Sequence, residues 1–201
     1  MPDPAVTEAT TEPRTSSAQV DGKALLSSPV AVPTLHCTRK LLPRLASTAF
    51  PTPAPSTAPA ANDSVPPARL APWTANLLSR DRKPIVLVTS HVTLLPVLVQ
   101  LAPAATFLAR LPEAIGDLLL ALGIPLRTVT SELEAMQSWT LAKTNERRVL
   151  GTMNDFALML SHYPDALSLR DAALQLARSP CSVIGMDSPD DATRRLLAPP
   201  A

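Results

Sequence analysis

The stretch WTANLLSRDRKPIVLVTSHVTLLPVLVQL, residues 73–101, decides the fold of this chain. Two runs rich in apolar and β-branched residues, 73–79 and 84–90, flank a short, charged connection. This pattern predicts two strands joined by a hairpin turn. A third strand is predicted over 94–101. Because Pro96 has no N–H to donate, this strand should lie at an edge of the sheet or contain a bulge.

The same region raises the alternative of a membrane span, because residues 84–109 contain no Asp, Glu, Lys or Arg and are long enough to cross a bilayer. Prolines at positions 84, 96 and 103 interrupt this stretch, which opens with the β-branched residues typical of strands. Buried strands separated by a turn fit it better, and we expect no membrane association.

The second half of the chain predicts helices. Residues 104–122 have the clearest helical spacing of apolar side chains, and Gly123 ends that helix. Pro112 within it predicts a kink or two shorter helices. A capping box formed by Ser131 and Glu134 predicts another helix start. Further helices are predicted over 146–163 and 167–178, and residues 139–143 could form a short strand.

Strands that precede helices along the chain indicate an α+β fold rather than a doubly wound one. We therefore predict a small, mainly antiparallel sheet covered by helices from the second half. Its predicted strands are 34–38, 73–79, 84–90 and 94–101. The first of them belongs to an island, TLHCTRKLLPRL at residues 34–45, between two proline-rich stretches, so it has to dock onto the later part of the domain.

The length of 201 residues suggests one domain with tails. Residues 1–33 show little periodicity, which predicts a disordered N-terminal tail rich in Pro, Ala, Ser and Thr. The segment 48–67 has the same bias and predicts an extended insert within a single α+β domain, residues 34–186. Residues 187–201 are expected to form a loose tail.

Composition limits the possible classes of function. The formal net charge is +1, so the chain has no overall basic field for nucleic acid, and electrostatic binding needs a local patch. Cys37 and Cys181 are too few for a disulfide framework or a zinc site. We expect two reduced thiols in a cytoplasmic protein without a secretory signal, with a single long-range disulfide as the alternative.

Other chemistry-bearing residues are scattered. His36, His91 and His162 have no partner at ligand spacing, which indicates packed or surface side chains rather than metal ligands. The chain has no phosphate-binding Walker loop, dinucleotide-binding glycine fingerprint, nucleophile elbow or zinc-protease motif. The sequence therefore predicts no metal and no cofactor, and it assigns no catalytic residue.

The best candidate for a functional site is TNERRVLGTMNDF, residues 144–156. On a helix, the core face consists of Val149, Met153, Phe156 and Leu160. A second face carries Arg148, Thr152 and Asp155, and the adjacent row carries Arg147, Gly151 and Asn154. Glycine inside a helix costs about 1 kcal/mol relative to alanine, so Gly151 indicates close approach of a ligand or another backbone.

The start of this helix predicts an anion site. Thr144 or Asn145 can cap the helix by accepting hydrogen bonds from first-turn amides. Lys143, Arg147 and Arg148 add positive charge where the helix dipole is already positive, which favours phosphate or carboxylate. The candidate anion-binding residues are Lys143, Asn145, Arg147, Arg148, Asn154 and Asp155. The function indicated is a small binding module for a nucleotide or a nucleic-acid phosphate.

Three alternatives stay open. Asp155 could form an ion pair with Arg148 or Lys143 and so lock the domain structurally. An enzyme could use Asn154 and Asp155, although nearby arginines lower the pKa of an aspartate and so disfavour it as a general base. A regulatory subunit could complete its apolar surface with a protein partner.

The chain also resembles an uncharacterised prokaryotic domain family of unknown function, over about residues 34–185. The family start, Leu-x-Cys-Thr-x-Lys-Leu-Leu, is present from Leu35 to Leu42, and its tryptophan-containing strand corresponds to 73–78. Its most specific motif, N-R-x-V-L-G-x-M-N-D-F, corresponds to Asn145 through Phe156, with Glu146 inserted or substituted in its first part. The resemblance implies domain boundaries and no activity.

This sequence departs from the family pattern at Pro72, Thr74 and Arg148, where the family tends to have Asp, Tyr and Ser. Arg148 in place of a small residue makes Arg147 the better candidate for an anion ligand.

Overall fold

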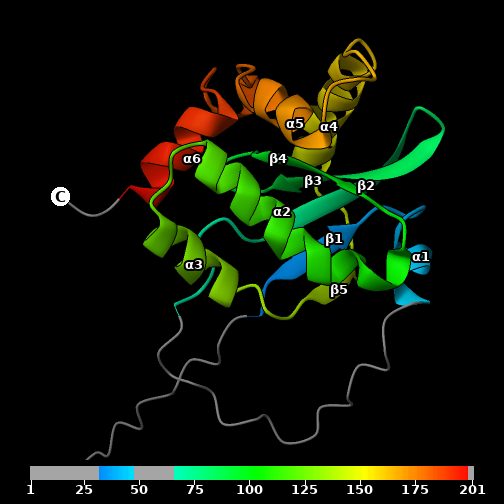
Figure 1. Ribbon diagram of the computed structural model, residues 1–201, viewed down its shortest axis with the longest axis horizontal. Coiled ribbons are helices and arrows are strands. Elements are labelled where there is room, and N and C mark those ends of the chain that lie inside the picture. Colours follow the sequence, from blue (N-terminus) through cyan, green and yellow to red (C-terminus); the bar gives the residue numbers. More distant parts are fainter. Residues whose placement is uncertain (1–31, 48–65, 199–201) are drawn as a thin grey trace, which may run out of the picture.

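A computed structural model of the chain describes residues 32–47 and 66–198 (Figure 1). The predicted hairpin is formed by β2 (Trp73–Arg80) and β3 (Lys83–Ser90). Asp81 and Arg82 form its two-residue turn, with positive φ angles of 48° and 58°, as a type I′ turn requires. The third predicted strand is β4 (Pro96–Gln100), which pairs with β3 at an edge of the sheet, where a strand proline is tolerated.

The island near the N-terminus docks into the sheet. Its strand β1 (Thr34–Cys37) lies between β2 and β5 (Thr140–Lys143) and is parallel to both. The strand order is β4-β3-β2-β1-β5. The predicted α+β class is confirmed, with a mixed sheet whose antiparallel pairings are β2–β3 and β3–β4.

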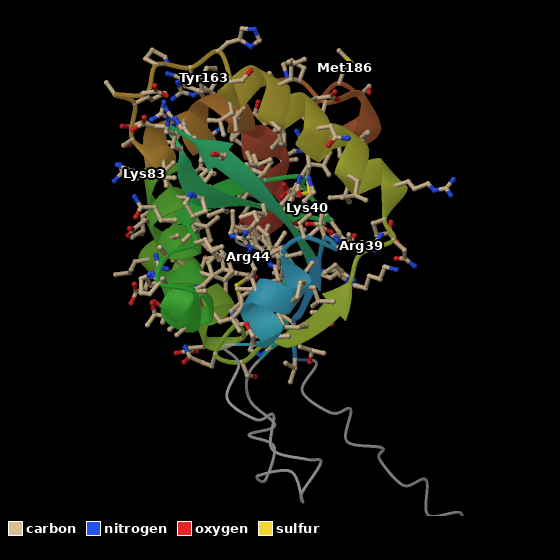
Figure 2. The ribbon with its side chains drawn as sticks, turned by 90° about the vertical axis from the view of Figure 1, so that its right-hand side faces the viewer. Arg39, Lys40, Arg44, Lys83, Tyr163 and Met186 are labelled. Carbon is tan, nitrogen blue, oxygen red and sulfur yellow. The ribbon has the colours of Figure 1, made fainter. Side chains whose placement is uncertain are left out.

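Helices cover both sides of this sheet. Figures 1 and 2 show α2 (Phe107–Ala121) and α4 (Arg147–Leu160) on opposite sides of the strands. The remaining helices are α1 (Leu42–Ala46), α3 (Leu126–Glu134), α5 (Leu169–Ala177) and α6 (Pro189–Leu197), with short 3-10 turns η1 (Ala104–Thr106) and η2 (Ser182–Ile184). The buried core is mainly aliphatic, and Trp73, Phe107 and Phe156 are its largest members.

One expected helix start was wrong, and one of the two alternatives for Pro112 is excluded. The capping box at Ser131 does not start a helix, because α3 begins five residues earlier, directly after Pro125. Proline has a fixed φ suited to a helix start, so Pro125 sets the boundary and Ser131 lies inside the helix. Pro112 does not divide its helix in two, because α2 is continuous from Phe107 to Ala121.

The expected loose tail after residue 187 was also wrong, because α6 occupies Pro189–Leu197. Ser188 caps this helix by accepting a hydrogen bond from the amide of Asp191. Thr193 and Leu197 are completely buried, and the Thr193 hydroxyl donates to Thr93 Oγ1 at 2.9 Å. Serine followed by proline and two aspartates is a helix-start pattern, so the sequence contained the signal.

The remaining boundary predictions concern residues that lie largely outside the described part of the chain. This applies to the N-terminal tail up to residue 31 and to the proline-rich insert up to residue 65. In the described part, Pro33 is buried and its carbonyl accepts a hydrogen bond from the amide of Thr140. Ordered structure therefore begins at least one residue before the predicted domain start.

The segment 84–109 forms β3, β4, η1 and the first turn of α2. Within residues 32–47 and 66–198, no helix has the length and apolar character needed to cross a bilayer.

Candidate functional site

Helix α4 begins without a side-chain cap. Glu146 occupies the N-cap position, and no side chain there accepts a hydrogen bond from the first turn. The expected cap by Thr144 or Asn145 was therefore wrong. Thr144 still follows the strand geometry of β5, because its amide donates to the carbonyl of Cys37 at 3.0 Å. The amides of the first turn thus remain available to a ligand.

The arginines of this first turn are not used structurally. Arg147 and Arg148 are exposed, and neither side chain forms an ion pair or a hydrogen bond with another described residue. Asp155 is exposed as well, and it too has no ion-pair partner in the described part of the chain. The proposed structural lock between Asp155 and Arg148 or Lys143 is therefore contradicted.

A groove of about 510 Å³ lies between α4 and the segment that follows α5. Arg147, Arg148 and Asp155 contribute its charged lining. Its other lining residues are Gly151, Thr152, Phe156 and Met159 from α4, with Ser179, Pro180, Cys181, Ser182, Val183 and Met186 opposite. Figure 2 shows Met186 beside α4. The groove thus has two cations at the helix start and apolar walls farther along.

The sequence model of one domain family matches residues 34–192, and its description is "Domain of unknown function (DUF6933)". The chain belongs to the DUF6933 family. The match confirms the resemblance to an uncharacterised domain family, and it extends into α6, in agreement with the ordered C-terminal helix. No match was found among the curated proteins or the solved structures.

Only three of the six predicted anion-binding residues line the groove of the DUF6933 domain. Lys143 is in register with Cys37, so its side chain leaves the sheet on the face opposite to that of His36. Asn145 and Asn154 are exposed and do not line the groove. The structure therefore brings together Arg147, Arg148 and Asp155, and it leaves Lys143, Asn145 and Asn154 outside.

Cys181 is the buried thiol of this groove. Burial raises the pKa of Cys181, and the nearby charge of Asp155 raises it further. Because the thiolate is the nucleophilic form, this thiol is poorly suited to attack a substrate at neutral pH. Both cysteines are free, so the long-range disulfide considered from the sequence is absent.

Gly151 lines the groove but is not needed for packing. Apart from its chain neighbours and the backbone of its own helix, a Cβ atom added there would meet no heavy atom within 4 Å. The predicted close approach of another backbone is therefore wrong within the described chain. The space in front of Gly151 belongs to the groove.

Sequence reasoning missed a pair of histidines in the DUF6933 domain. The rings of His36 and His91 are stacked, with their centroids 5.2 Å apart. Nε2 of His91 lies 2.6 Å from Oγ1 of Thr74, and Thr74 is the register partner of His36 on the neighbouring strand. Nδ1 of His36 is buried and has no hydrogen-bond partner among the described residues.

The start of α4 lies close enough to act electrostatically on His91. Burial lowers the pKa of His91; His36 and Arg148 lower it further, and Glu146 partly opposes them. The two histidines are 55 positions apart in sequence, so only the docking of β1 beside β2 could reveal them. No group of three or more metal-ligating side chains occurs in residues 32–47 and 66–198.

Proposed function

We propose that the DUF6933 domain is a small binding module for a ligand with an anionic group, such as a nucleotide or a nucleic-acid phosphate. The main observation behind this proposal is that Arg147 and Arg148 line a groove and form no ion pair or hydrogen bond with another described residue. Guanidinium groups bind phosphate through paired, charge-assisted hydrogen bonds. The uncapped amides of the same turn add donors and a favourable helix dipole.

The groove also suggests how the rest of the ligand is held. Phe156, Met159 and Val183 provide apolar walls, which suit a base or another flat apolar group. Asp155 repels an anion, so the anionic group belongs at the arginine end. A hydroxyl or amino group of the ligand would donate to the Asp155 carboxylate.

A direct test is titration of a fluorescent mononucleotide into the full-length protein at low salt. The double variant Arg147→Ala/Arg148→Ala should bind at least about 10-fold more weakly, because two charge-assisted contacts are lost. Arg127→Ala is the matched control, because Arg127 is exposed on α3 and does not line the groove. Equal binding by the double variant, or no binding by the wild type, would overturn the proposal.

A protein partner is the second candidate, supported by Met186, which lines the groove and is 66% exposed. A partner's apolar side chain could fill the groove in place of a base. Binding of the mononucleotide would argue against it. An enzyme acting through Asn154 and Asp155 has less support, since Asn154 lies outside the groove.

We also propose a cytoplasmic location in a prokaryotic cell. The two free thiols suit a reducing compartment, and the source follows the family resemblance. Fractionation of cells of the source organism would test the location.

A further inference from the structure

The basic residues of this nearly neutral chain are unevenly distributed. The full sequence has a formal net charge of +1. Residues 34–47 and 140–155, by contrast, contain six Lys and Arg residues and two acidic residues, Glu146 and Asp155. Three of the six, Arg39, Lys40 and Arg44, lie on the N-terminal island and were not part of the site predicted from the sequence.

The topology of the sheet brings these two segments together. Strands β1 and β5 are parallel neighbours, so the turns that follow them leave the same edge of the sheet. The hydrogen bond from the amide of Thr144 to the carbonyl of Cys37 extends this pairing to the ends of both strands. Figure 2 shows Arg39 and Lys40 on the side of the molecule where α4 begins, with Lys83 on the other side.

Five of these cations form a surface without ion pairs among the described residues. We define the basic patch as Arg39, Lys40, Lys143, Arg147 and Arg148. All are exposed, and none forms an ion pair with another described residue. The ion pairs of the described chain lie elsewhere, at Arg80 and in the region of α6.

We infer that the basic patch binds the phosphate backbone of a nucleic acid, and that the groove holds one nucleotide of that strand. This inference rests on the proposed function and specifies that the ligand is a polymer, a nucleic-acid strand. Lys143 leaves the sheet on the face opposite to that of His36. Arg148, by contrast, lies near His91, whose ring stacks on His36. Successive phosphates of one strand can reach both sides, whereas a single phosphate suits only one.

The same surface indicates the mode of recognition. None of the five patch residues is aromatic, so the patch itself offers no aromatic platform on which bases stack, as they do on aromatic single-strand binders. Contacts with phosphates carry little sequence information and respond strongly to salt. Binding should therefore be weakly sequence-dependent and steeply salt-dependent.

The test measures fluorescence anisotropy of a labelled single-stranded oligonucleotide with the full-length protein. Five phosphate contacts on a single strand give a slope of about −3.5 in log affinity against log salt. Affinity should then fall about 100-fold between about 50 mM and about 200 mM salt. For Arg39→Ala/Lys40→Ala, three remaining contacts predict a fall of only about 20-fold.

The matched control is Lys83→Ala/Arg127→Ala, which removes two exposed cations outside the patch. It should retain the wild-type salt dependence. If Arg39→Ala/Lys40→Ala behaves like this control while mononucleotide binding still requires Arg147 and Arg148, the inference is overturned and the proposed function survives.

Two further results would overturn the inference. If neither mononucleotide nor oligonucleotide binds the wild type, the inference and the proposed function fail together. If poly-glutamate competes as effectively as unlabelled oligonucleotide, the patch recognises acidic protein instead. Weak competition by poly-glutamate, together with the reduced salt dependence of Arg39→Ala/Lys40→Ala, supports the inference.

Discussion

Replacing Glu132 by alanine should lower the free energy of unfolding by about 3 kcal/mol. Glu132 projects from α3, and the residue is only 4% exposed. Its Oε1 accepts a hydrogen bond from the amide of Arg69 at 2.9 Å, and its Oε2 accepts one from the amide of Leu70 at 3.4 Å. These bonds hold the chain that leads into β2.

The magnitude follows from the geometry of the two bonds. A hydrogen bond to a charged acceptor contributes about 1.5–3 kcal/mol, and the shorter bond belongs in that range. The longer bond contributes less, and the cost of burying the carboxylate offsets part of the sum. Glu132→Gln keeps the shape and the acceptor for Arg69, so it should cost about 1–2 kcal/mol.

The pH dependence provides a second check on this carboxylate. Burial raises the pKa of Glu132 above its ordinary value of 4.5, and the amides of Arg69 and Leu70 partly oppose this. The folded protein therefore holds this proton more tightly than the unfolded chain. The resulting stability is fully present below pH 4.5 and is lost as the pH rises through the folded-state pKa. The advantage of wild type over Glu132→Gln should widen as pH falls from neutral.

Urea denaturation at several pH values measures both effects. The control is Glu134→Ala, which removes an exposed carboxylate from the same helix and should change stability by no more than about 0.5 kcal/mol. A loss of less than about 1 kcal/mol for Glu132→Ala, against the charge-assisted range above, would refute the reasoning. So would a gap between wild type and Glu132→Gln that stays constant with pH.

Three other outcomes are expected. Gly151→Ala should raise the free energy of unfolding by about 0.5–1 kcal/mol, because outside its own helix the new Cβ meets no heavy atom within 4 Å. Unchanged ligand affinity in the same variant would argue against a ligand seated in the groove at Gly151. Burial, with help from His36 and Arg148, lowers the pKa of His91, so stability should decline as pH falls below its ordinary value of 6.5. Melting curves of His91→Gln should show a weaker decline, and an identical one would contradict the assignment. Burial raises the pKa of Cys37 to about 12, so a thiol reagent should modify Cys37 only after unfolding; mass spectrometry of the native protein would reveal any earlier reaction.

Much of the fold could be predicted because its signals are local. Alternating and β-branched residues identified the hairpin, and the spacing of apolar residues identified α2 and α4. Local sequence patterns gave a wrong helix start where two of them competed. The serine at position 131 has the chemistry of a cap, but Pro125 had already fixed the helix start.

The candidate site was only partly predictable, for a different reason. Spacing on the helix placed Arg148 and Asp155 on one face and Arg147 in the adjacent row, and the groove contains all three. Lys143 is close to them in sequence, but strand alternation turns it to the other face. Nothing in the sequence indicated that His36 and His91 are in contact, because their contact depends on which strands are neighbours.

The sequence by itself determined the central hairpin, the apolar faces of α2 and α4, and the cations at the start of α4. Only the tertiary structure decided that β1 lies between β2 and β5. That single placement stacks the two histidines and brings Arg39 and Lys40 to the edge where α4 begins. Periodicity is a property of a few neighbouring residues, whereas strand order depends on how distant segments bury their apolar faces together.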